Sequence, residues 1–136
     1  DVDPAGLPTW TDLEASLNDD ATVVLVDTST GERIPLWAEP DVGAALPEDR
    51  LLVIHPAVGL EPATTYAVGL RGLTTTGGES IAVSPVFTAY RYRLTTDLPA
   101  IEERRDAMED TFDALAEGGV ARDELQLAWS FTTAST

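Results

Sequence analysis

The stretch of the chain that most constrains its fold is residues 60–70, with the sequence Leu-Glu-Pro-Ala-Thr-Thr-Tyr-Ala-Val-Gly-Leu. Pro62 ends a short loop, and Tyr66, Val68 and Leu70 then alternate with two small residues. Because successive side chains of a β-strand point to opposite faces of the sheet, this alternation predicts a half-buried strand that starts near Tyr66.

Tyr66 itself carries a more specific signal. It stands at the start of the strand, just after a Leu-x-Pro turn, which is the position of the tyrosine corner in β-sandwiches. In that motif the ring packs into the core and the hydroxyl group bonds to the backbone a few residues upstream. The sequence therefore predicts a mainly β fold, a sandwich of about seven strands.

A hairpin is expected earlier in the chain. Residues 23–26 are apolar and mostly β-branched, and residues 33–38 return after an Asp-Thr-Ser-Thr-Gly turn. Pro35 has no amide hydrogen, so the return strand is expected at a sheet edge or with a bulge. Residues 51–55, which end at Pro56, are expected to form the next strand.

The last strand is expected over residues 125–133. Its apolar side chains alternate strictly, so they point to one face of the sheet: Leu125, Leu127, Trp129 and Phe131. This pattern places Trp129 in the core.

One inserted α-helix is expected at about residues 98–117, inside an insertion that spans about residues 81–124. Its apolar residues share one face at helical spacing: Ile101, Met108, Phe112 and Leu115. Asp97 is expected to cap the start of this helix, Pro99 to lie in its first turn, and Gly118 and Gly119 to end it.

The strand at 23–26 is apolar on both faces, so it is expected to have a neighbour on each side. Three segments could supply the missing neighbour: residues 1–7, residues 81–87, or a strand donated by another chain. We favour residues 81–87, because Ile81, Val83 and Phe87 carry apolar side chains that residues 1–7 mostly lack.

Composition limits the possible functions. The 136 residues suit a single domain spanning residues 1–136, expected to be a piece of a longer protein. The 24 acidic and 8 basic residues give a net charge of −16, which disfavours binding to nucleic acid or to anionic membrane surfaces. No apolar run is long enough for membrane insertion. All basic residues are arginines, so lysine chemistry is excluded, and the lack of cysteine excludes disulfides and thiolate metal sites.

No set of residues predicts catalysis, and no catalytic, cofactor-binding or metal-binding residue is assigned. His55 is the only histidine, and neither a nucleophile nor an orienting partner is signalled beside it. None of six serines lies in a Gly-x-Ser-x-Gly elbow: Ser16, Ser29, Ser80, Ser84, Ser130 and Ser135. We expect no enzymatic activity and no cofactor.

Two groups of carboxylates and the tryptophans are candidates for binding sites. Loop carboxylates could bind calcium but lack a calcium-loop spacing: Asp19, Asp20, Asp27, Glu39 and Asp41. The helix carboxylates form a water-facing stripe rather than a facing catalytic pair: Glu102, Glu103, Asp106, Glu109, Asp110 and Asp113. Of Trp10, Trp37 and Trp129, only Trp37 is kept as a candidate for stacking on a sugar.

Taken together, the Val-rich strand, the Leu60–Tyr66 stretch and the closing Trp-Ser-Phe-Thr-Thr of residues 129–133 resemble the bacterial Ig-like domain of S-layer-type proteins. That family is related in shape to fibronectin type III. The resemblance covers residues 21–78 and 125–133. The chain departs from the family in lacking a clear first strand within residues 1–20 and in carrying the helical insertion.

The resemblance implies a non-catalytic accessory, spacer or interaction module of a longer secreted or cell-surface bacterial protein. An α/β-hydrolase domain follows similar modules in some such proteins, so it is a possible neighbour here. Its partners would be neighbouring domains of the parent chain or other copies of itself. The alternative is a self-assembling surface subunit of an adhesin, S-layer or filament, held by strand-edge or calcium-mediated contacts.

Overall fold

The computed structural model describes residues 2–41, 43 and 51–135. The strands and helices are, in chain order: η1 (Pro4–Gly6), η2 (Leu13–Leu17), β1 (Val23–Asp27), β2 (Leu36–Pro40), β3 (Leu52–Pro56), β4 (Thr65–Arg71), α1 (Pro85–Arg91), α2 (Pro99–Glu102), α3 (Arg105–Glu117), η4 (Arg122–Glu124) and β5 (Leu125–Thr132).

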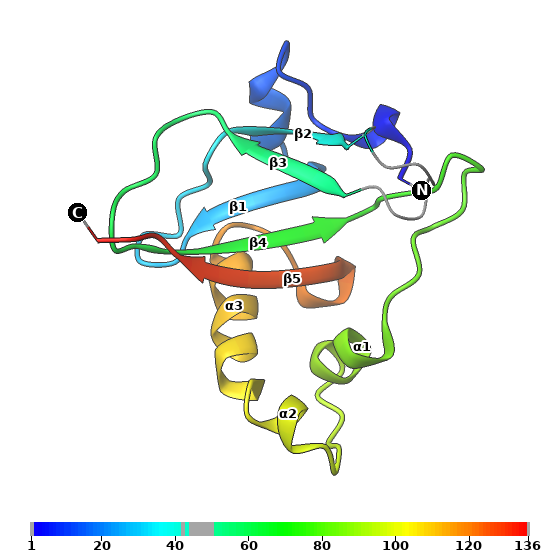
Figure 1. Cartoon of the computed structure of the whole chain (residues 1–136), viewed down its shortest axis with the longest axis vertical. Coiled ribbons are helices and arrows are strands. Elements are labelled where there is room, and N and C mark those ends of the chain that lie inside the picture. Colours follow the sequence, from blue (N-terminus) through cyan, green and yellow to red (C-terminus); the bar gives the residue numbers. More distant parts are fainter. Residues whose placement is uncertain (1, 42, 44–50, 136) are drawn as a thin grey trace.

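The five strands of the described residues form two antiparallel sheets (Figure 1). One sheet has three strands in the order β1-β4-β5, and the other pairs β2 with β3. Helices α1, α2 and α3 lie on the face of the three-stranded sheet opposite to β2 and β3 (Figure 1). The fold thus mixes two β layers with a helical layer, and the expected count of seven strands is not confirmed.

The predicted hairpin forms only in part. After the turn at the end of β1, the Asp27 amide donates to the carbonyl of Glu32 (2.9 Å) and the Ile34 amide to the carbonyl of Leu25 (2.8 Å). Beyond Pro35 the chain leaves this sheet, and β2 pairs with β3 instead of β1. The expectation that residues 33–38 form one return strand is wrong, because Pro35 cannot continue the ladder and marks the change of sheet.

The expectation that residues 81–87 pair with residues 23–26 is also wrong. The bonded neighbour of β1 on one side is β4, and on the other side it is the short stretch around Arg33. Residues 85–91 instead form α1, whose start is capped by the Ser84 hydroxyl, which accepts a hydrogen bond from the Phe87 amide (3.1 Å). A Ser-Pro pair is a favourable helix start, and it outweighs the apolar character of the segment.

Two apolar cores lie on the two faces of the three-stranded sheet. The core shared with β2 and β3 contains Leu7, Val23, Leu25, Leu36, Ala38, Tyr66, Val68, Leu70 and Leu73. The core shared with the helices contains Ala21, Val24, Val26, Ala67, Phe87, Tyr90, Ile101, Phe112, Ala114, Leu115, Val120, Leu125 and Ala128. Strand β1 therefore buries both of its faces, as its sequence predicts.

The predicted helix is interrupted. Its four apolar residues do face the core, as expected, but α2 ends at Glu102 and α3 begins at Arg105. The N-cap residue of α2 is Leu98 rather than Asp97, and no side chain caps it. At the other end the prediction holds, since α3 stops at Gly118 and Gly119 has a positive φ of 93°.

The prediction for Tyr66 is confirmed. Its side chain is buried, and its hydroxyl oxygen accepts a hydrogen bond from the amide of Glu61, five residues upstream (2.9 Å). The bond ties the loop before β4 to the strand itself, while the ring fills the core between the two sheets.

Candidate interaction surface

Strand β5 exposes three large apolar side chains. Leu127 is 42% exposed, and Trp129 and Phe131 are each 36% exposed. The prediction that Trp129 lies in the core is wrong. Leu127, Trp129 and Phe131 share a face, as predicted, but Leu125 is buried in the core beneath the helices, because the β4–β5 ladder shifts register between Leu70 and Arg71. Strand β5 is the outer strand of its sheet, and the described core between the sheets draws on β1 and β4 but not on β5. We call Leu127, Trp129 and Phe131 the β5 row.

The β5 row is held in place by the sheet beneath it. Trp129 lies opposite Val68, and Phe131 lies opposite Tyr66, whose ring stacks on it with centroids 5.7 Å apart and planes at 25°. Because Tyr66 is itself fixed by its bond to Glu61, the ring of Phe131 rests on a rigid support. Little side-chain entropy would be lost if this surface were covered by a partner.

The backbone of β5 has one open side. The Thr133 amide donates to the Thr64 carbonyl (2.9 Å), which makes Thr65 and Thr132 a non-hydrogen-bonded pair of the antiparallel ladder. By alternation, Phe131 and Trp129 bond to β4, while the amide and carbonyl groups of Ala128, Ser130 and Thr132 point away from the sheet. These are the groups that an added strand would use.

Among the described residues, the open edge of β5 carries none of the usual protection against pairing. Natural edge strands are blocked by charged side chains, proline or a covering segment. From Leu125 to the end of the sequence there is no charged residue and no proline, in a chain with a net charge of −16. Within the described part of the chain, a side chain bonds to one carbonyl of β5, the first, through Nη1 of Arg91 (2.7 Å to Leu125 O).

An apolar hollow adjoins one end of the β5 row. It has a volume of about 230 Å³ and its lining includes Leu127 together with Leu70, Leu73 and Ile81. Its polar lining residues are Gln126 and Ser84. The Gln126 side chain is bonded to the backbone of Leu73 in both directions (2.8 and 2.9 Å), and the Ser84 hydroxyl caps α1. The hollow therefore extends the apolar surface without adding a free polar group for catalysis or ligand orientation.

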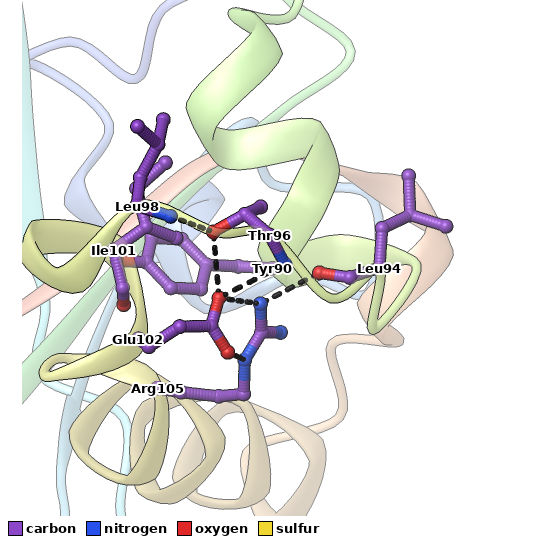
Figure 2. Close-up of polar contacts among 7 residues, drawn as sticks. All are labelled: Tyr90, Leu94, Thr96, Leu98, Ile101, Glu102 and Arg105. Carbon is purple, nitrogen blue, oxygen red and sulfur yellow. Dashed lines mark hydrogen bonds and ion pairs between the residues drawn. The ribbon is translucent and has the colours of Figure 1, made fainter.

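A polar cluster joins the three helices (Figure 2). Glu102 accepts bonds from Arg105 (3.0 and 2.9 Å) and from the hydroxyl of Thr96 (2.8 Å), and the Arg105 guanidinium also donates to the Leu94 carbonyl (2.6 Å). These bonds from Arg105 and then Thr96 lower the pKa of Glu102 to about 2. All of the groups satisfy one another, so the cluster fixes the helical layer and offers no site.

The same layer is fixed at two further points. The buried Tyr90 hydroxyl donates to the Ile101 carbonyl (2.8 Å), which ties α1 to α2. Arg122 pairs with Glu109 (2.6 Å) and lies over the ring of Phe112, 4.1 Å from its centroid. The Arg122 contact holds the pKa of Glu109 below its usual value. Two of the six helix carboxylates are thus structural ion pairs, and the other four face water.

The structure gives His55 two partners, neither of them a nucleophile. Its Nε2 lies 3.3 Å from Oε1 of Glu39, and its ring stacks on Trp37 with centroids 3.8 Å apart and planes at 11°. Trp37 is directly opposite His55 in the β2–β3 pair. One face of the Trp37 ring is therefore covered by His55, which weakens its candidacy for stacking on a sugar. Trp10 is 70% exposed, outside both sheets.

Three of the candidate serines serve the fold: Ser16, Ser80 and Ser84. Buried Ser16 donates to the Leu13 carbonyl (2.6 Å) and accepts from the Leu36 amide (3.0 Å), joining η2 to β2. Ser84 caps α1, and the Ser80 hydroxyl accepts a hydrogen bond from the side-chain amide of Gln126 (3.2 Å).

The carboxylates considered for calcium lie in three separate places: before β1 (Asp19 and Asp20), at the end of β1 (Asp27) and at the end of β2 (Glu39 and Asp41). Asp27 is occupied by the hydroxyl (2.6 Å) and amide (2.9 Å) of Ser29, which lower its pKa. Within residues 2–41, 43 and 51–135, no group of three or more acidic or histidine side chains is arranged to hold a metal ion.

Comparisons of the chain with protein-family models, with curated proteins and with solved structures found no match. No helix in the described part of the chain is both long and apolar enough to cross a membrane. The resemblance to the bacterial Ig-like domain accordingly rests on the residues quoted for it.

The β5 row is the surface that sequence reasoning missed. The alternation of Leu127, Trp129 and Phe131 predicts one apolar face, but it does not show whether another layer covers that face. The signal that points to exposure is the absence of charge from residue 125 onward, combined with the position of this strand at the edge of the sheet.

Proposed function

We propose that this chain is a non-catalytic interaction module, an Ig-like β-sandwich with a helical insertion, that serves a longer secreted or cell-surface bacterial protein. The observation that carries the proposal is the β5 row, an aromatic surface on an open and uncharged strand edge of an otherwise acidic chain. Exposed apolar side chains grouped in this way are typical of protein–protein contact sites.

Two features support the fold assignment within this proposal. The Tyr66 hydroxyl bonds to the backbone five residues upstream, as in a tyrosine corner, and the two sheets share one apolar core. The helical layer on the other face corresponds to the insertion that sets this chain apart from the resembled family. The proposal assigns no catalytic role, and loss of any measured hydrolytic activity in a His55→Ala variant would overturn that part of it.

Site-specific photo-crosslinking tests the contact role of β5. A photoreactive phenylalanine is placed at position 129 in the natural gene, and the same residue at position 10 serves as the control, because Trp10 is also exposed but lies outside β5. We expect a crosslinked product from position 129 that contains a neighbouring domain or another chain, and none from position 10. Equal labelling from both positions, or none from either, would overturn the proposal.

The alternative is a self-assembling surface subunit, and the open edge of β5 is the observation that favours it. In this case contacts between copies would be the function itself. A calcium titration followed by thermal melting separates strand-edge from calcium-mediated assembly. A rise of several degrees at millimolar calcium would favour the calcium-mediated form, and an unchanged melting temperature would favour strand-edge contacts or a spacer.

A further inference from the structure

We propose that the open edge of β5 pairs with β5 of a second copy of this chain, in antiparallel register, to form a continuous six-stranded sheet. The inference deepens the proposed function and rests on it, since it names the partner of the β5 row. It is argued from the charge of the chain, from the hydrogen-bonding parity of the strand and from the order of its side chains.

Charge limits how a second copy can bind. Each copy carries a net charge of −16, so two copies repel one another over most of their surfaces. From Leu125 onward the sequence has no charged residue, so edge-to-edge contact through β5 places no charged side chain of these strands between the copies. The reason for choosing a second copy is the fit of β5 to itself, in hydrogen bonding and in side-chain order.

The alternation of inward and outward backbone groups along β5 allows the strand to pair with a second copy of itself. The outward groups belong to Ala128, Ser130 and Thr132, and an antiparallel pair centred on Ser130 makes Ser130 of the two copies a hydrogen-bonded pair. Ala128 then faces Thr132 of the second copy, and this pair is also hydrogen-bonded. The pairing uses every outward group from Ala128 to Thr132 and stays clear of the Leu125 carbonyl that Arg91 occupies.

The same register aligns the aromatic residues. Trp129 of each copy lies directly opposite Phe131 of the other, in non-hydrogen-bonded pairs where side chains come closest. Cross-strand aromatic pairs stabilise antiparallel sheets, and here two such pairs form at once. Each of these residues is 36% exposed in the single copy, and the pairing covers the flanks of the rings that face the second copy.

Sedimentation equilibrium of the 136-residue chain measures the association. We expect a monomer–dimer equilibrium that strengthens as sodium chloride is raised, because salt screens the repulsion between two acidic copies. Ser130→Pro removes an outward amide without removing a bond to β4, and it is expected to weaken dimerisation about tenfold or more, since two hydrogen bonds are lost. Trp129→Glu is expected to abolish the dimer, and Trp10→Glu, a matched change outside β5, is expected to leave it intact.

Amide hydrogen exchange keeps the test independent of whether Ser130→Pro folds. At high protein concentration the amides of Ala128, Ser130 and Thr132 are expected to be protected from exchange. On dilution these three β5 amides are expected to exchange quickly, while the amides of Trp129 and Phe131 stay protected by their bonds to β4. A chain that is monomeric at millimolar concentration in high salt, or a dimer in which the outward amides are not protected, would overturn this inference. In either case, a crosslink from position 129 to a different polypeptide would leave the proposed function standing. If no such crosslink formed, both the proposed function and the dimer would be refuted.

Discussion

Removing one oxygen atom from Tyr66 gives a direct measure of how strongly the start of β4 is held. In Tyr66→Phe the ring still fills the core, so no cavity forms, but the Glu61 amide loses its partner at 2.9 Å. A single hydrogen bond of this kind contributes about 1 kcal/mol to the free energy of unfolding. For a domain of this size that corresponds to a fall in melting temperature of roughly 3–5 °C.

The control for this prediction is Tyr92→Phe. Tyr92 is 55% exposed and its hydroxyl bonds to the side chain of Arg91 (2.9 Å), so water can replace the contact and the change is expected to stay within about 0.5 kcal/mol. Urea unfolding is measured for both variants at the same protein concentration, and repeating it at a tenfold lower concentration controls for any dimerisation. If Tyr66→Phe proved no less stable than Tyr92→Phe, the bond to Glu61 would not hold the loop as argued.

Three further predictions concern the helical layer. A Cβ atom on Gly69 would lie 2.8 Å from a methyl of buried Leu125, so Gly69→Ala is expected to lower the free energy of unfolding by about 1–3 kcal/mol; a neutral change in urea would contradict this packing. Leu115→Ala is expected to cost about 2–5 kcal/mol, because Leu115 is fully buried between α3 and the sheet; a loss under 1 kcal/mol would contradict it. The pKa of Glu102 falls from 4.5 to about 2 on folding, so its contribution is fully present above pH 4.5 and is lost as the pH drops toward 2. The difference in melting temperature between the natural chain and Glu102→Gln should therefore shrink between pH 5 and pH 2, and a constant difference would show that the pairing with Arg105 does not depend on the charge.

Much of the strand content could be predicted because it depends on local patterns. The alternation after Pro62 located β4, and the β-branched run located β1. The face of each strand side chain followed from the period of the strand, except at Leu125, where the register shift between Leu70 and Arg71 turns the side chain toward the helices. The pattern does not show which strands of one sheet are covered by the other sheet. The sequence therefore predicts a core position for Trp129, whereas the residue lies half-exposed on the outer strand β5.

The helical layer was harder to predict because tertiary contacts decide its boundaries. The segment that became α1 is rich in residues that favour strands, and only Ser84 followed by Pro85 indicated a helix start. The break between α2 and α3 has no glycine or proline to mark it. It falls where Arg105 reaches back to the Leu94 carbonyl and to Glu102, contacts that cannot be inferred from spacing alone.

A single disulfide tests the central claim, that the open edge of β5 binds a second copy in the register centred on Ser130. The natural chain has no cysteine, so a Ser130→Cys variant contains one thiol. In this register the two copies of residue 130 form a hydrogen-bonded pair with Cα atoms about 5.5 Å apart, a distance that a disulfide spans. In Thr132→Cys, the matched control, the two thiols would be four residues out of register, roughly 13 Å apart. Under mild oxidation we predict rapid formation of a covalent dimer by Ser130→Cys and not by Thr132→Cys; equal rates for the two variants, or no dimer from either, would contradict the account.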